Sequence, residues 1–308
     1  MFEELDKYKS LGLFARQVVE GFITGLHKSP FHGFSVEFAE HRQYNSGEST
    51  RHIDWKLFAR TDKLFVKRYE EETNLRCHII IDHSSSMYYP LERQGQLPHP
   101  NKLTFAVYGA ALLVELLLRQ RDAFGLTLFS DQVDLQTDVR GSVAHQHYLY
   151  NILEGMLHPV EVGKLEKRGT EITQNLHLMA ERMHRRSMVA IFTDALIDKE
   201  HSGMLFDALR HLRHCKHEVM LFHTLDTSHE VNFEFGSQPL LLIDMESDRR
   251  LKVFPHQVAA AYRSEMQRQT EELRQHAMRY RIDYIPVDVA KGFEQVMLPY
   301  LLKRGKHL

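Results

Sequence analysis

Apolar and polar positions follow one another along the chain in patterns that predict strands and helices in turn. Apolar runs, such as the one within residues 187–192 and the three isoleucines within 78–81, are typical of strands buried on both faces of a parallel sheet. Apolar residues that recur every three or four positions predict amphipathic helices between them. From residue 75 the expected order is strand 78–81, helix 102–121, strand 123–129, helix 143–157, helix 170–185, strand 187–192, helix 202–213 and strand 218–223.

This alternation predicts an α/β fold in which helices flank a doubly wound, mostly parallel sheet, as in Rossmann-like proteins. Beyond it, residues 233–254 predict a β-hairpin, and a helix at 256–280, a strand at 281–287 and a helix at 292–303 follow. We therefore predict one main domain at 75–308 with a hairpin insertion at about 231–255. The loop after Met87 contains three prolines, so we expect it to be exposed and variable in conformation.

Residues 1–74 are predicted to form an N-terminal helix and a β-rich extension. Residues 2–27 carry an apolar face that includes Leu11, Phe14 and Val18, which predicts an amphipathic helix that packs on another part of the protein. Residues 34–72 have a β-like pattern interrupted by a turn at residues 45–47. Within them, Asp54 could be catalytic, but an aspartate bonded to a neighbouring arginine is the commoner arrangement.

Composition and charge exclude several classes of function. The chain has 308 residues, 43% of them hydrophobic, and a formal net charge of -2, which argues against a protein whose main task is to bind nucleic acid phosphates. Its two cysteines fit a reducing compartment, and its charged first residues lack the apolar core of a signal peptide. The longest apolar run, residues 103–118, is interrupted by Glu115 and is too short to span a bilayer. We expect a cytoplasmic protein without an integral membrane segment.

The strongest candidate for chemistry follows the strand at 78–81. Asp82, Ser84 and Ser86 alternate directly past its end, where open α/β sheets place their ligand sites. One carboxylate and two hydroxyls form a hard oxygen site that suits Mg²⁺ or Mn²⁺. The alternative is a helix N-cap, because Asp and Ser also accept hydrogen bonds from the first backbone N–H groups of a helix.

Two further strand ends could add ligands to this site. Thr170 begins a predicted helix and Asp194 closes the strand at 187–192, so both could approach Asp82 at one edge of the sheet. The five residues together resemble the metal-ion-dependent adhesion site of von Willebrand factor A-like domains. The resemblance implies that the serines and the threonine contact the metal directly or through water, and that an acidic side chain of a partner fills its open position. The predicted metal ligands are Asp82, Ser84, Ser86, Thr170 and Asp194.

A second pattern of residues covers most of the chain. It consists of Glu40, Arg42, Tyr44, Gly47, Glu48, Arg51, Ile53, Asp54, Trp55, Lys56, Ala59, Arg60, Leu64, Val66, Lys67 and Glu71, followed at once by the Asp82 strand. In this pattern the sequence resembles the bacterial family catalogued as domain of unknown function 58, without the paired membrane helices of many relatives. This resemblance implies a von Willebrand factor A-like protein that works with a MoxR-type AAA+ ATPase.

We therefore expect a non-enzymatic, metal-dependent adaptor that binds the ATPase and an acidic residue of a client protein. One alternative is a Mg²⁺-dependent hydrolase or phosphatase that uses Asp82 and Asp194. Another is a structural domain whose metal site stays empty. The chain contains no phosphate-binding loop of the Gly-x-x-x-x-Gly-Lys type, so it is not itself expected to be an ATPase.

Overall fold

The computed structural model describes residues 10–27, 41–43, 55–61, 64–67, 75–159, 172–196, 199–246 and 249–305. The chain divides into two compact units, residues 26–74 and residues 1–25 with 75–308. Helix α1 (Leu11–His27) packs on the larger unit, where the ring of Phe14 lies edge-on to Tyr108 at 4.6 Å. The predicted 1–74 domain thus differs from the compact units, because the apolar face of α1 is buried with residues that follow 74.

A six-stranded sheet forms the centre of the larger unit, in the order β10-β7-β6-β3-β4-β5. Its strands are parallel except β5, which pairs antiparallel with β4 at one edge. The α/β fold with a mostly parallel sheet is therefore confirmed. The strands are β3 (Arg76–Asp82), β4 (Ala123–Phe129), β5 (Val133–Gln136), β6 (Met188–Thr193), β7 (Glu218–Leu225) and β10 (Asp283–Asp288).

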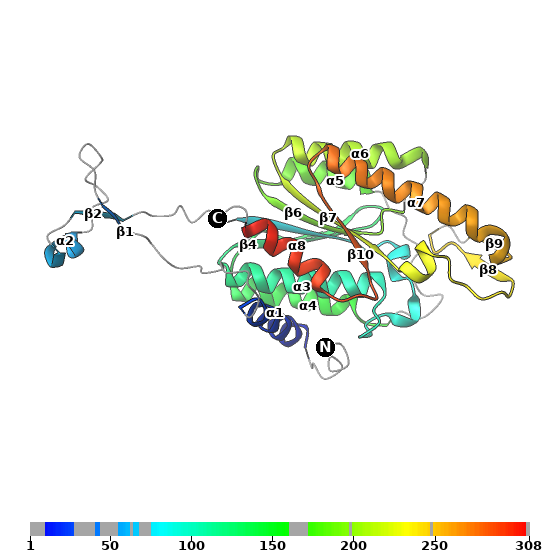
Figure 1. Cartoon of the computed structure of the whole chain (residues 1–308), viewed down its shortest axis with the longest axis horizontal. Helices are drawn as coiled ribbons and strands as arrows, with labels where there is room; N and C mark the ends of the chain where they lie inside the picture. Colours follow the sequence, from blue (N-terminus) through cyan, green and yellow to red (C-terminus); the bar gives the residue numbers. More distant parts are fainter. Residues whose placement is uncertain are drawn as a thin grey trace. The chain divides into compact units, whose positions relative to one another are not determined.

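Helices cover both faces of this sheet (Figure 1). One layer consists of α5 (Ile172–Arg182), α6 (Lys199–His214) and α7 (Pro255–Arg279), and the other of α3 (Lys102–Arg119), α4 (Val143–Met156) and α8 (Glu294–Gly305), with α1 outside it. Because both faces are covered, β3 is buried from Cys77 to Asp82 and β6 is buried along its whole length. Helix α3 approaches closely at Gly109, where an added Cβ would lie 3.0 Å from the ring of Phe192.

The smaller unit contains a two-stranded antiparallel ribbon of β1 (His41–Gln43) and β2 (Phe65–Lys67). Between them lies the short helix α2 (Trp55–Thr61), inside the stretch for which a β-like pattern predicted strands. That prediction missed the helix because β-propensity is weak in short segments. Asp54 lies outside the described residues.

Two other parts of the chain differ from expectation. Strand β5 was not predicted, since Val133–Gln136 is short and only half-buried at the edge of the sheet. The proline-containing loop is packed and includes the 3₁₀ helices η3 (Ser85–Tyr88) and η4 (Leu91–Arg93). In this loop Asn101 is fully buried, and its amide donates to the carbonyl of Tyr88 at 3.0 Å. The loop is ordered because such side chains satisfy its backbone groups.

The central strand β3 contains a buried histidine. His78 is 7% exposed, and among the described residues its Nε2 has no hydrogen-bond partner. Burial, together with the positive charges that His217, His184 and Arg76 can carry, lowers the pKa of His78 to about 4. The folded protein therefore disfavours protonation of a side chain that would otherwise titrate near pH 6.5.

We predict that His78 makes the folded unit sensitive to acid. Its neutral form is favoured on folding, so full stability is present above about pH 6.5 and is lost as the pH falls towards about 4. Between about pH 7.5 and pH 4.5, urea unfolding of wild type should lose roughly 2.5 kcal/mol more than unfolding of a His78→Val variant. The exposed His147→Gln variant should lose as much as wild type, and equal losses in all three proteins would contradict the prediction.

Candidate functional site

The topology of the sheet creates a crevice at the carboxyl ends of β3 and β6. These strands are neighbours, but the chain continues from β3 to β4 on one side and from β6 to β7 on the other. The loops that leave them therefore diverge, and such a switch point is where open α/β sheets bind ligands. Asp82 is the last residue of β3, and Asp194 directly follows β6.

The first loop holds its polar side chains through local hydrogen bonds. Asp82 is fully buried, and its two carboxylate oxygens accept hydrogen bonds from the Ser84 N–H at 2.9 Å and the Thr193 hydroxyl at 2.7 Å. The hydroxyls of Ser84 and Ser86 lie 3.1 Å apart, and Ser86 in turn hydrogen-bonds to Asp194. Four of the five predicted ligands are thus brought into one connected group, in which Ser86 is the half-buried member. Thr170 lies outside the described residues.

A buried lysine completes the charged centre of this site. The Lys102 ammonium, with no exposed surface, lies 2.7 Å from Asp194 Oδ2 and 2.5 Å from Glu230 Oε1. Lys102 is the first residue of α3, and Glu230 belongs to the short π-helix η5 (Thr227–Val231). We call Asp82, Asp194, Glu230 and Lys102 the buried charge cluster, in which Glu230 is half-buried and the other three are buried.

The two aspartates of the cluster have opposite pKa shifts. Burial and the nearby negative charge of Asp194 raise the pKa of Asp82 to about 7. Burial would also raise the pKa of Asp194, but the charge and hydrogen bond of Lys102, with hydrogen bonds from Ser86 and Leu196, lower it below its usual value. Asp194 is therefore the ionised carboxylate, and Asp82 is the one that lacks a counter-charge.

The charges of this cluster fit a divalent cation. Three carboxylates face one ammonium, so two negative charges remain unbalanced when every group is ionised. Buried charges of one sign are costly without a partner, and Mg²⁺ or Mn²⁺ carries the missing two charges and prefers oxygen ligands. No group of three or more His, Cys, Asp or Glu side chains suited to a metal occurs within the described part of the chain. The predicted ligands are of another kind, two carboxylates and three hydroxyls, and include Thr170.

Sequence reasoning missed Lys102 and Glu230. A signal for Lys102 did exist: a lysine in the first turn of an apolar helix is unfavourable beside the positive end of the helix dipole, so it requires carboxylates nearby. Glu230 offers no comparable signal, because its position depends on how the loop after β7 folds. Thr193, whose hydroxyl orients Asp82, was not among the predicted site residues either.

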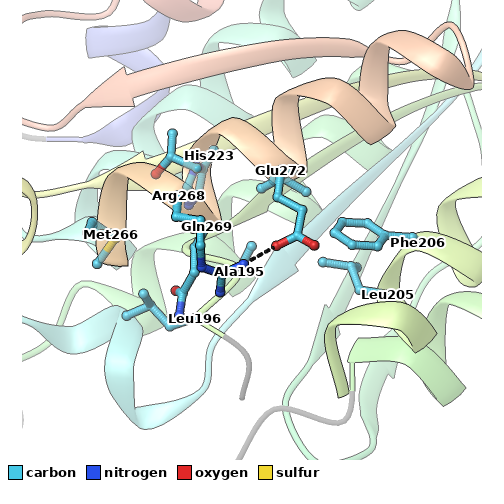
Figure 2. Close-up of a pocket in the computed structure, with 11 residues that line it drawn as sticks. Ala195, Leu196, Leu205, Phe206, His223, Met266, Arg268, Gln269 and Glu272 are labelled. Atoms are coloured by element: carbon cyan, nitrogen blue, oxygen red, sulfur yellow. Dashed lines mark hydrogen bonds and ion pairs between the residues drawn. The ribbon is translucent and has the colours of Figure 1, made fainter. Parts of the chain in front are cut away.

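A pocket opens beside the site, where the chain continues from Asp194 (Figure 2). Its walls come from the loop after β6, from α6 and from α7, with the Arg268–Glu272 ion pair at 2.8 Å among its polar groups. Leu196 is 36% exposed, so the pocket has an accessible apolar wall close to Asp194. The lining residues are Ala195, Leu196, Leu205, Phe206, His223, Met266, Arg268, Gln269, Thr270, Glu272 and Leu273.

Two histidines near the site, His223 and His83, are engaged in hydrogen bonds. His223 Nε2 lies 2.7 Å from the carbonyl of Asp194, and its Nδ1 lies 2.7 Å from the Tyr284 hydroxyl. Burial lowers the pKa of His223 to about 4, so the ring is neutral and both nitrogens are used. His83 points towards Asp134, with 2.6 Å between Nε2 and Oδ2. Neither ring is therefore placed as a general base for a substrate at the charge cluster.

Comparison with known proteins places this architecture in a family. The family described as "Protein of unknown function DUF58" matches residues 40–276, which is most of the chain. The uncharacterized proteins Mb1516 of Mycobacterium bovis and Rv1480 of Mycobacterium tuberculosis are each 24% identical to this chain over 221 residues. These residues are 71% of this chain and 64% of each relative, so the chain spans less than two thirds of their length.

Solved structures resemble the chain more distantly. The conserved hypothetical protein BatB from Bacteroides thetaiotaomicron has 14% identity and a TM-score of 0.45, covering 76% of this chain and 100% of that one. An aerotolerance-related membrane protein from Bacteroides fragilis has 16% identity and a TM-score of 0.45, covering 73% of this chain and 97% of that one. In this chain, none of the helices within the described residues is long and apolar enough to cross a membrane.

We predict that the charge cluster depends on Lys102 for stability. A Lys102→Met variant leaves Asp194 and Glu230 buried without their counter-ion, which should lower the free energy of unfolding by about 3–5 kcal/mol. Adding Asp194→Asn and Glu230→Gln should recover part of this loss, because it removes the uncompensated charges. Lys291→Met, which removes an exposed ion-paired lysine, should change stability by less than about 1 kcal/mol in the same urea titrations. A similarly small effect of Lys102→Met would contradict the prediction.

Proposed function

The chain belongs to the DUF58 family of proteins of unknown function, and we propose that it is a non-enzymatic, metal-dependent protein-binding module. In this proposal its fold is of the von Willebrand factor A-like type. The site at the carboxyl ends of β3 and β6 binds Mg²⁺ or Mn²⁺, and through the ion it binds an acidic side chain of a partner. The observation that carries the proposal is the unbalanced negative charge of the buried charge cluster, next to the linked hydroxyls of Ser84 and Ser86.

The residues that would hold the ion are Asp82, Ser84, Ser86, Thr170 and Asp194. When bound, the ion supplies a positive charge that attracts a carboxylate of the partner. Thr193 orients Asp82 through its hydroxyl, and Lys102 keeps Asp194 ionised. Ser86 is half-buried and is more exposed than Asp82, Ser84 and Asp194. The pocket beside Leu196 offers room for a second side chain of the partner that supplies the carboxylate.

The proposed partners are a MoxR-type AAA+ ATPase and a client protein that supplies the acidic residue. In this role the protein is a cytoplasmic adaptor that recruits the client to the ATPase for assembly or remodelling of a complex. The support for the ATPase is the resemblance of residues 40–71 to the family pattern, and the support for an acidic client is the chemistry of the site.

The main alternative is a Mg²⁺-dependent hydrolase that uses Asp82 and Asp194. Binding is favoured over hydrolysis because the nearby rings of His223 and His83 are held by Asp194, Tyr284 and Asp134, so neither of these two histidines is positioned to activate water. Release of nitrophenol from p-nitrophenyl phosphate that depends on both Mg²⁺ and Asp82 would favour the hydrolase. A third hypothesis is a structural domain that binds no metal. It requires that divalent ions do not change the free energy of unfolding.

We predict that Mg²⁺ stabilises the wild-type protein through Asp82. At a concentration about 100 times its Kd, Mg²⁺ should raise the free energy of unfolding by about 2.7 kcal/mol, measured by urea titration with Mg²⁺ and with EDTA. An Asp82→Asn variant should show no such gain, because it loses the negative charge that the ion neutralises. In EDTA this variant should be at least as stable as wild type, since it removes a carboxylate that Asp194 repels.

The matched control is Asp207→Asn on the exposed surface of α6, which should respond to Mg²⁺ as wild type does. Mn²⁺ binding followed by electron paramagnetic resonance gives an independent readout. Equal stabilisation of wild type and Asp82→Asn would show that Asp82 is not a ligand of the stabilising ion.

We also predict that partner binding depends on the metal site. With wild-type and Asp82→Asn baits in native cell lysate, an AAA+ ATPase or its client should be retained only by wild type with Mg²⁺, as identified by mass spectrometry. Retention should fall about tenfold or more in EDTA, because a partner carboxylate then meets unbalanced negative charge. Identical proteins on both baits, with and without Mg²⁺, would place the binding surface elsewhere.

A further inference from the structure

Exposed apolar side chains are concentrated in the β-hairpin that joins η5 to α7. The hairpin consists of β8 (Leu240–Ile243) and β9 (Arg250–Val253), which pair antiparallel and form a separate two-stranded sheet. Leu241 and Ile243 are 55% and 48% exposed. Leu251 and Phe254 are also exposed. Contiguous exposed apolar residues on a folded protein mark an interaction surface more often than single ones do.

The register of the hairpin separates its two faces. Leu241 lies opposite Lys252 and Ile243 lies opposite Arg250, and directly opposite residues point to the same face. All four are exposed. On the other face Val253 is buried and Leu240 and Leu242 are half-buried, while Leu251, opposite Leu242, is exposed. We call Leu241, Ile243, Arg250 and Lys252 the outer face of the hairpin.

This outer face combines two aliphatic side chains on β8 with two cations on β9. Within the described part of the chain, neither Arg250 nor Lys252 has an ion-pair partner, so both charges are available to a ligand. A segment that places carboxylates against β9 and aliphatic side chains against β8 matches the face in both charge and polarity. The outer edges of a two-stranded sheet can additionally pair with an extended peptide backbone.

Basic and apolar residues together could also suit an anionic membrane surface. The turn of the hairpin argues for a protein ligand instead, because it carries Asp244, which is exposed, and Glu246, which is half-buried. Insertion of the turn into anionic lipid would bring these carboxylates against like charge.

We propose that the outer face of the β8–β9 hairpin is a docking surface for a partner protein segment rich in acidic and aliphatic residues. The hairpin lies next to the start of α7 (Figure 1), and because α7 leads back to the start of the parallel strand β10, this part of the larger unit is on the carboxyl side of the sheet. It is separate from the buried charge cluster, and binding there requires no metal. A partner bound to the hairpin is therefore held near the carboxyl edge of the sheet whether or not the metal site is engaged.

Selection of peptides against the full chain tests this proposal. Phage-displayed random peptides of about 12 residues are panned in EDTA, which removes any contribution of a divalent ion, and enriched peptides are measured by fluorescence anisotropy. We expect enriched sequences to combine Asp or Glu with Leu, Ile or Val. The double variant Arg250→Glu with Lys252→Glu should weaken their binding by about tenfold or more, and should favour peptides in which the acids are replaced by lysine.

Two controls make the result specific. Arg185→Glu with Arg186→Glu changes the net charge equally in the turn between α5 and β6 and should alter affinity by less than about twofold. Asp82→Asn should bind the peptides as wild type does, so that failure of the metal site and failure of the hairpin proposal are distinguishable. Enrichment of sequences without acids, no enrichment, or equal binding to the hairpin variant would overturn the proposal. Sedimentation of wild type, but not of the hairpin variant, with phosphatidylglycerol vesicles would overturn it in favour of a membrane surface.

Discussion

The ammonium of Lys102 is the interaction on which the candidate site depends. It joins three segments that are distant in the sequence, namely the start of α3, the loop after β6 and the π-helix η5. Without a cation at this point, Asp194 and Glu230 would be buried beside each other, and their repulsion would separate the loops. Lys102 is the first residue of α3, and the residue before it, Asn101, caps that helix and is itself fixed by the packed proline-containing loop. The geometry of the site is therefore set by the loops as much as by the strands.

One ammonium is too little charge for three carboxylates, and this deficit gives the site its chemical character. Asp194 is paired with the Lys102 ammonium, whereas Asp82 is equally buried but has no positively charged partner. The pKa of Asp82 near 7 reports this imbalance, since protonation is one way to remove a buried charge and a bound cation is another. A purely structural ion pair would have evolved no such excess, because unpaired buried charge lowers stability. Residues that cost stability are common at functional sites.

Much of the fold could be predicted from the chain, and the reasons for the failures are physical. Parallel strands covered on both faces leave long apolar runs, so β3, β6 and β7 were recognisable. Their carboxyl ends then placed Asp82, Ser84, Ser86 and Asp194 at one edge, as the structure does. Strand β5 was missed because a short edge strand lacks that pattern. Glu230 was missed because its position is set by contacts between loops, which neither periodicity nor spacing encodes.

The two proposed surfaces differ in charge, and this difference gives them distinct roles towards one acidic partner. The outer face of the hairpin is basic and attracts carboxylates at all times, whereas the charge cluster carries excess negative charge and repels them until a cation is bound. The hairpin would therefore contribute affinity that is independent of metal, and the cluster would contribute affinity that is conditional on it. A partner docked on the hairpin would have a high effective concentration at the metal site. Even a weak contact there would then make the affinity of the partner depend on the ion. If both proposals hold, this arrangement would let a small change in metal occupancy decide between a loosely and a tightly held partner.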